Sequence, residues 1–229
     1  MLFALLLAFG VSGCIGADGQ RAEALLQQAQ NAQASITSEK FVMRFDIEAE
    51  GKQISMSMDG GAYLKGPHRG DFYFTMSGSG VPQMSALNMS IVRRGNIAEV
   101  RAAGRTQRVS APAEQSQFGS PTSMLQLARY VKSVSVDETA YNGRPADRIV
   151  GKLDTNALLG SAGGFATKAL GSSGVHLGDI RAVLFVPRDT HLVEVMFADL
   201  DIKADGHKAH LHISIASRDI NKPVSIPEL

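Results

Sequence analysis

The strongest constraint on the fold is a period of two in the hydrophobicity of residues 41–76. Three runs alternate apolar and polar side chains, with breaks at Gly51 and Gly70. Such alternation is typical of strands whose two faces meet different surroundings, and short breaks between the runs predict antiparallel neighbours. One face then carries large apolar side chains, mostly Phe and Met: Phe41, Met43, Phe45, Met56, Met58, Phe72, Phe74 and Met76.

This Phe- and Met-rich face has two interpretations. It is either the packed core of a β protein or the wall of an apolar pocket, and Met89 and Ile91 of a later alternating run would extend it. Met is unbranched and polarizable, so it suits a surface that adapts to varied apolar partners. Alternation alone does not distinguish a filled core from an open space.

Further alternating runs continue to the C-terminus and predict about ten antiparallel strands, with Asn142-Gly143 as the clearest hairpin turn. Residues 21–34 lack Gly and Pro and predict a helix, and shorter helices are expected after Pro121, with Val131 among its apolar positions, and after Asp154.

A sheet of this size tends to curl, and helices over its concave face would leave an apolar space. The predicted fold is therefore α+β, with one large curled antiparallel sheet and helices covering its concave face. The Gly- and Ser-rich residues 160–178 are expected to form a mobile, partly helical cover, and residues 220–227 an extended tail along the sheet edge.

The N-terminus predicts export. Residues 2–11 form an uncharged apolar run of signal-peptide length, too short to span a bilayer, and Cys14, the sole cysteine, follows Val11-Ser12-Gly13. This pattern resembles a bacterial lipobox, in which the cysteine is diacylated; the alternative is an ordinary secretory signal with an incidental cysteine. We expect a signal peptide over residues 1–13, a tether over 14–20 and one domain over 21–229, anchored by acyl chains to the outer face of the cell membrane.

Composition and motifs argue against several other classes. The net charge is +1 and Trp is absent, so a nucleic-acid partner is not expected. The sequence contains no G-x-S-x-G, H-E-x-x-H or P-loop motif, and Cys14 is assigned to the lipobox, so we expect neither enzymatic activity nor a cofactor. His210 and His212, with Asp205 nearby, are the best metal-ligand candidates. They lie opposite Leu211 on a strand, so a solvated face is favoured over a metal site.

Five arginines concentrate within a short span: Arg93, Arg94, Arg101, Arg105 and Arg108. A solvated sheet edge is the simpler interpretation of this cluster. The alternative is contact with anionic headgroups, either of the membrane or of a carried lipid.

Several segments, in order, resemble the LppX/LprA/LprF/LprG family of actinobacterial envelope lipoproteins. After Cys14 come ITSEKFVMRFDIEAEG, DGGAYL, YNGRPADRIVGKLD, FVPRDTHLVEVMF and the terminal DINKPVSIPEL. The resemblance implies a fold similar to the LolA/LolB carriers: a curved antiparallel half-barrel with helices covering its concave face and an apolar cavity between them. It also implies binding of acylated lipids or glycolipids and their movement across the envelope. It supplies no residue-level motif for a headgroup.

Two functional hypotheses follow. The first is a membrane-anchored carrier or chaperone for an acylated lipid or glycolipid, working with an envelope transporter and holding the lipid against the Phe- and Met-rich face. The second is a structural or regulatory envelope lipoprotein with a filled core that binds another protein through its sheet edge or convex face.

Overall fold

The computed structural model describes residues 17–80, 88–110, 130–154, 176–177, 179–204 and 207–229. Within these ranges the chain forms one helix and twelve strands. They are α1 (Ala17–Gln33), β1 (Ser38–Ala49), β2 (Lys52–Tyr63), β3 (Phe72–Ser79), β4 (Met89–Arg94), β5 (Ile97–Ala102), β6 (Arg105–Ser110), β7 (Val131–Tyr141), β8 (Arg144–Leu153), β9 (His176–Leu177), β10 (Ile180–Pro187), β11 (Val195–Ala204) and β12 (His207–Arg218).

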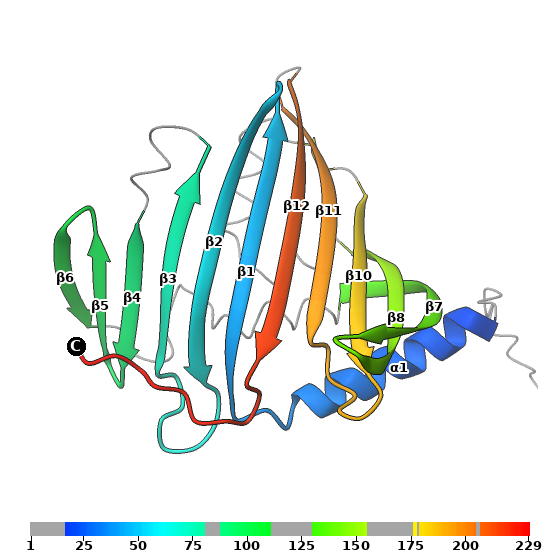
Figure 1. The fold of residues 1–229 in the computed structure, drawn as a ribbon, viewed down its shortest axis with the longest axis horizontal. Helices are drawn as coiled ribbons and strands as arrows, with labels where there is room; N and C mark the ends of the chain where they lie inside the picture. The colour runs from blue at the N-terminus through cyan, green and yellow to red at the C-terminus, as the bar shows by residue number, and fades with distance from the viewer. Residues whose placement is uncertain (1–16, 81–87, 111–129, 155–175, 178, 205–206) are drawn as a thin grey trace, which may run out of the picture.

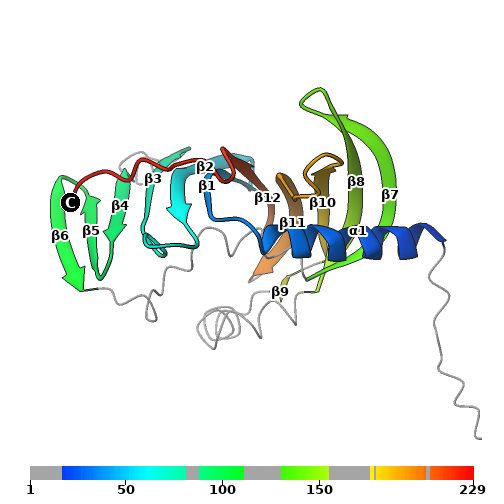
Figure 2. The same ribbon diagram turned by 90° about the horizontal axis from the view of Figure 1, so that it is seen from below.

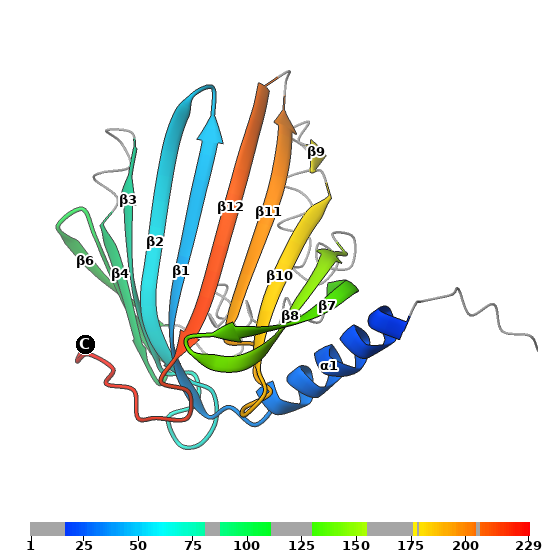
Figure 3. The same ribbon diagram turned by 45° about the vertical axis from the view of Figure 1, so that its right-hand side comes forward.

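The strands form one antiparallel sheet in the order β6-β5-β4-β3-β2-β1-β12-β11-β10-β8-β7, with β9 paired to β11. The first and last long strands, β1 and β12, pair at the centre, so the two halves of the chain build the two halves of the sheet (Figure 1). Seen from below, the sheet is a single bent layer (Figure 2), and β7 and β8 cross the direction of β1 and β12 (Figure 3). The α+β class and the curved antiparallel half-barrel are confirmed.

Two tight turns fix the register of the β1–β2 and β7–β8 hairpins. Glu50 and Gly51 join β1 to β2, and Asn142 and Gly143 join β7 to β8; all four have positive φ. Two central residues of positive φ give the turn whose twist matches the flanking strands, and Asn-Gly adopts it with little strain. The hairpin predicted at Asn142-Gly143 is confirmed.

Helix α1 lies along the lower ends of β10, β8 and β7 (Figures 1 and 3). Its buried face consists of Ala22, Leu26 and Ala29, which join the same apolar cluster as the sheet residues. The guanidinium of Arg21 lies 2.9 Å from Glu138 on β7, which ties the helix to the edge of the sheet. The helix begins at Ala17 and not at residue 21, so the last four residues of the predicted tether are helical.

The sequence predicted that the C-terminal tail runs along the sheet edge, and this is wrong. The tail crosses the lower ends of the strands (Figure 1). The amide of Asn221 donates to the carbonyl oxygen of Ser38, and the amide of Val224 donates to the hydroxyl of Tyr63. Val224 is buried against Gly61 of β2, which has no side chain to fill the space. A side chain set into a gap left by a glycine explains why this tail crosses the sheet.

Two further expectations differ from the structure, and a third group lies outside the described residues. The described strands number twelve, two more than predicted. Val131, expected in a helix, is the first residue of β7. The helices predicted after Pro121 and Asp154, and the cover over residues 160–178, lie outside the described ranges apart from β9. Within the described ranges, no helix combines the length and apolar character needed to cross a membrane.

Candidate functional site

The predicted Phe- and Met-rich face is one continuous surface of the sheet. We call it the inner face, meaning the side that carries Phe41 and Met43 and packs with α1 in a single apolar cluster. Residues paired across antiparallel strands point to the same side, so the register shows that all ten predicted cavity residues share this face.

Four methionines form a straight row across four neighbouring strands. Met43 of β1 pairs with Met58 of β2, Met58 pairs with Met76 of β3, and Met76 pairs with Met89 of β4. The row continues on the other side of Met43 through Ile215 of β12 to Met196 of β11. Neighbouring side chains in such a row are in contact range, so the methionines present one flexible, polarizable surface.

Burial divides the predicted residues into two groups. Five are buried: Phe41, Met43, Phe72, Phe74 and Ile91. The other five are only partly buried: Phe45, Met56, Met58, Met76 and Met89. The first group packs as core, whereas the second presents accessible apolar surface towards the β1–β2 turn and on β3 and β4.

The inner face extends further than the sequence reasoning went. On β12, β11, β10 and β8 it continues through residues that were not predicted to line a site: Leu211, Ile213, Met196, Ala198, Leu200, Ala182, Leu184 and Ile149. Ala198, Ala182 and Gly151 pair in one row, so small side chains there lie beside the bulkier methionine row. The signal was present, because residues 196–200 and 211–215 alternate as regularly as residues 41–47.

Two hollows open at the upper end of the sheet. One, of about 510 Å³, lies beside the β5–β6 turn and is lined by Met76, Met89, Ala102 and polar neighbours. The other, of about 380 Å³, lies between the tips of the two central hairpins and is lined by Ala49, Ile202 and His207 among others. The first hollow lies at the strand ends, where residues of both faces line it, and it reaches Met76 and Met89 at the accessible end of the methionine row.

Three ionisable side chains are buried at the lower end of the inner face: Glu39, Arg93 and Asp147, the last of which binds Arg188. Glu39 is almost fully enclosed and accepts a hydrogen bond of 2.8 Å from the Ser217 hydroxyl. Its burial raises the pKa of the carboxyl, and the hydrogen bond from Ser217 opposes this only in part. Arg93 is equally buried, and its Nε donates to the carbonyl oxygen of Gly95 at 3.0 Å. The arginine cluster read from the sequence is therefore not one surface, because Arg93 faces inward.

The remaining arginines of the cluster lie on the surface. Nε of Arg94 donates to the carbonyl oxygen of Pro227 and helps to hold the tail. Arg101 and Arg108 both bind the carboxylate of Glu99, at 2.6 and 2.7 Å. Hydrogen bonds from Arg108 first and Arg101 second lower the pKa of Glu99.

The histidine pair lies on the outer face, as predicted. Nδ1 of His210 lies 2.9 Å from Oδ1 of Asp201, and Nδ1 of His212 lies 2.7 Å from Oδ1 of Asp199. The hydrogen bond with Asp201 raises the pKa of His210. In the part of the chain that the structure describes, no three His, Cys, Asp or Glu side chains are arranged to hold a metal ion. Cys14 and Asp205 lie outside that part.

Comparison with known proteins supports the fold. No family model matches the chain, and no curated protein matches its sequence. The structure is similar to LprF from Mycobacterium bovis, with a TM-score of 0.58 and 15% identity over 93% of this chain and 99% of LprF. It is also similar to the lipoprotein LppX from Mycobacterium tuberculosis, with a TM-score of 0.53 and 13% identity over 91% and 99% of the two chains. The chain therefore has the fold of LprF and LppX, and the resemblance read from its sequence is confirmed at the level of the fold.

Proposed function

We propose that this chain is an envelope lipoprotein that binds an acylated lipid or glycolipid along its inner face and carries or chaperones it across the cell envelope. The observation that carries the proposal is the methionine row, which runs from the buried centre at Met43 to partly accessible Met76 and Met89. A core that served stability alone would not need accessible apolar side chains at one end of a continuous row.

Apolar burial alone can hold an acyl chain. Burial of a methylene contributes about 0.8 kcal/mol, so ten buried methylenes would contribute about 8 kcal/mol. Before the costs of ordering are subtracted, this equals a Kd of about 1 μM. Apolar contact with Met58, Met76, Met89 and Phe45 would therefore retain a lipid without any polar contact to its headgroup.

The fold shared with LprF and LppX supports an envelope role, and Cys14 supports attachment to the outer face of the cell membrane by acyl chains. The role proposed is non-enzymatic, with the bound lipid as cargo and an envelope transporter as the partner that delivers or receives it. It requires no metal and no cofactor.

A matched pair of variants tests the lipid site. Met76 and Thr75 are neighbours in β3 on opposite faces, so Met76→Lys places a charge on the inner face and Thr75→Lys places it on the exposed outer face. Native mass spectrometry of the purified proteins should show lipid bound to the wild type and to Thr75→Lys, and much less bound to Met76→Lys. Equal lipid in both variants, or none in the wild type after extraction from its own membranes, would refute the proposal.

A separate experiment tests the anchor. Cys14→Ser should abolish labelling by a radioactive fatty acid and move the protein from the membrane fraction to the soluble fraction. Full labelling of the variant would show that Cys14 is not the acylated residue.

A further inference from the structure

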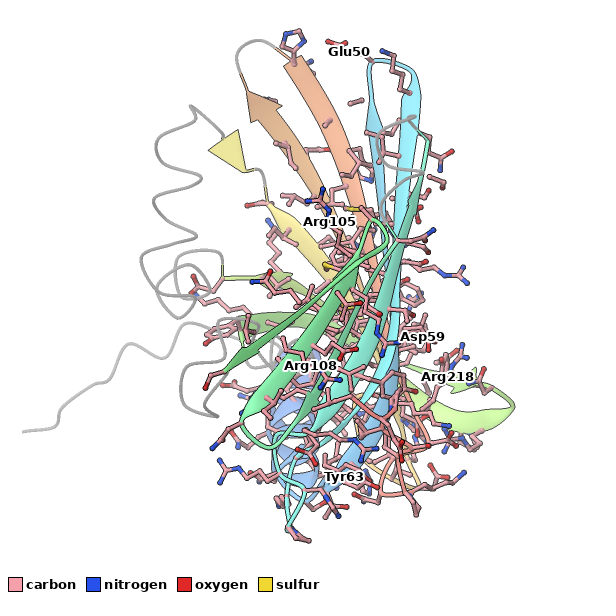
Figure 4. The ribbon with its side chains drawn as sticks, turned by 90° about the vertical axis from the view of Figure 1, so that its left-hand side faces the viewer. Glu50, Asp59, Tyr63, Arg105, Arg108 and Arg218 are labelled. Carbon is pink, nitrogen blue, oxygen red and sulfur yellow. The ribbon has the colours of Figure 1, made fainter. Side chains whose placement is uncertain are left out.

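Strand β6 is the last strand on one side of the sheet, and all six of its residues are exposed. Among the described residues, its only strand partner is β5. Figure 4 looks at the sheet from this side and shows Arg105 and Arg108 on the strand that faces the viewer (Figure 4). An exposed edge strand presents a row of backbone donors and acceptors that another chain can pair with.

The turn between β5 and β6 shows which of these backbone groups point outward. Only Ala103 and Gly104 separate the paired residues Ala102 and Arg105. In a two-residue hairpin the closing pair exchanges both hydrogen bonds, and such pairs then alternate along the ladder. The N–H and C=O groups of Arg105, Gln107 and Val109 therefore face β5. Those of Thr106, Arg108 and Ser110 face away from the sheet.

The charge of residues 88–110, which contain β4, β5 and β6, differs from that of the rest of the chain. Residues 88–110 contain five Arg and one Glu, a net charge of +4 in a protein whose net charge is +1. The side chains of Arg101 and Arg108 are 54% and 60% exposed, although both bind Glu99. Ile97 and Val109, the exposed large apolar residues of the described chain, lie at the other end of the same hairpin, at 48% and 38%. Among the described residues, the edge thus combines outward backbone groups that have no strand partner, positive charge, and the exposed side chain of Val109 on the inner face, with Ile97 on the outer face of the neighbouring strand.

These features discriminate between occupants. A second copy of the chain, paired β6 to β6, would bring two segments of charge +4 together, which charge repulsion disfavours. A lipid surface would match the charge but not the backbone groups of Thr106, Arg108 and Ser110. An extended segment of another protein matches both the charge and the backbone groups when it carries acidic side chains, and an apolar side chain on its inner face would cover Val109.

We propose that β6 is a docking edge for an extended acidic segment of a partner protein, which adds to the sheet as a further strand beside Thr106, Arg108 and Ser110. Main-chain hydrogen bonds supply the geometry, and Arg105 on the inner face and Arg108 on the outer face each select an acidic side chain on their own side of the added strand. The docking edge does not depend on the lipid-binding proposal, because β6 supplies no residue of the predicted lipid surface.

The test uses a synthetic peptide, acetyl-TEVEVEVT-amide, and the purified protein, with binding measured by titration calorimetry. Thr106→Pro removes an outward N–H without changing the charge, and proline is tolerated at edge positions that face solvent. It should weaken binding about fivefold, the effect of one lost hydrogen bond. Gln107→Ala, whose N–H faces β5, is the matched control and should leave the Kd within about twofold. The glutamates of the peptide share one face of the added strand, whereas Arg105 and Arg108 lie on opposite faces of β6. Either Arg105→Gln or Arg108→Gln should therefore weaken binding and reduce its dependence on salt, and the other should not.

Hydrogen exchange on the wild-type protein gives a measurement that does not rely on any variant. Peptide binding should slow exchange at the amides of Thr106, Arg108 and Ser110, with little change at Gln107 and Val109. A peptide N-methylated at alternate residues should fail to bind, and equal binding of that peptide would overturn the proposal. Binding to anionic phospholipid vesicles that depends on Arg105, with no binding of the peptide, would overturn it in favour of a membrane-contact surface.

Discussion

The adjacent residues Gly60 and Gly61 of β2 allow a quantitative test of how the two faces of the sheet are packed. A Cβ added at Gly61 would lie 2.6 Å from Cγ1 of Val224, so the C-terminal tail is the nearest obstacle on the outer face. A Cβ added at Gly60 would clash with the backbone carbonyl oxygen of Tyr73 and would lie 2.5 Å from Cζ of Phe41 and 2.8 Å from Cβ of Phe74, on the inner face. The two substitutions therefore strain different layers of the molecule.

The expected magnitudes follow from these contacts. Gly61→Ala should cost about 1–3 kcal/mol of unfolding free energy through overpacking against Val224. Val224→Ala removes two buried methyl groups and should cost about 1.6 kcal/mol plus a smaller cavity term. In the double variant the new methyl group fills part of the space that Val224 leaves. Its cost should therefore fall below the sum of the single costs by about 1–2 kcal/mol.

Urea unfolding of the wild type, both single variants and the double variant measures this coupling. Each kcal/mol corresponds to a Tm change of about 2–4 °C for a chain of this size. Gly60→Ala provides the control, because Phe41 and Phe74 are on the other face and Val224→Ala should not relieve the strain there. The reasoning is refuted if Gly61→Ala and Val224→Ala prove additive within about 0.5 kcal/mol, or if Val224→Ala rescues Gly60→Ala equally well.

Two further substitutions probe buried polar groups. Burial raises the pKa of Glu39, so ionisation of the folded protein is disfavoured and stability falls as pH rises above the ordinary carboxyl value of 4.5. Glu39→Gln keeps an acceptor for Ser217 and does not lose stability in this way. It should be more stable than the wild type at pH 7 and equal to it below pH 4. The same advantage at both pH values would show that ionisation of Glu39 is not the cause. Asp147 is buried and accepts hydrogen bonds from Nε and Nη2 of Arg188, at 3.2 and 2.8 Å. Asp147→Ala should therefore lower the free energy of unfolding, measured in urea, by about 1.5–3 kcal/mol. Asp189→Ala, at an exposed ion pair, should stay within about 0.5 kcal/mol of the wild type, and equal losses in the two variants would show that burial is not the cause.

Much of the inner face could be predicted because alternation and turn geometry are local properties. The turn at Glu50-Gly51 leaves only two residues between the strands, which pairs Ala49 with Lys52 and, by the same register, Met43 with Met58. The pairing of Met43 with Met58, which is the part of the methionine row on β1 and β2, could therefore be predicted from the sequence. The pairing of Met76 with Met89 was not, because the connection between β3 and β4 is too long for a turn type to fix the register.

Other features depend on contacts between distant parts of the chain, and local patterns did not reveal them. Val224 packs into the space beside Gly61, which lies 163 residues earlier in the chain. Composition therefore predicted an extended tail but not the path that the tail takes. Arg93 was grouped with its exposed neighbours on the basis of their charge, without regard to the face of the strand on which each lies. Its position two residues after Ile91 already placed it on the inner face.

The register also relates the two proposed surfaces. Met89, at the end of the methionine row, pairs with Ala102 of β5, and Ala102 pairs with Arg105 of β6. A strand added to β6 would therefore extend the same row, and its inward side chains would lie beside the accessible end of the inner face. If both proposals hold, the docked segment forms the rim over which a lipid enters or leaves. Binding of the acidic peptide should then change lipid affinity, and lipid should change peptide affinity by the same factor, because coupling between two sites is reciprocal. Calorimetric titration of the peptide into lipid-loaded and lipid-free protein measures this factor. A factor of one would mean that docking at β6 and the lipid on the inner face are energetically independent, even though they share one row of the sheet.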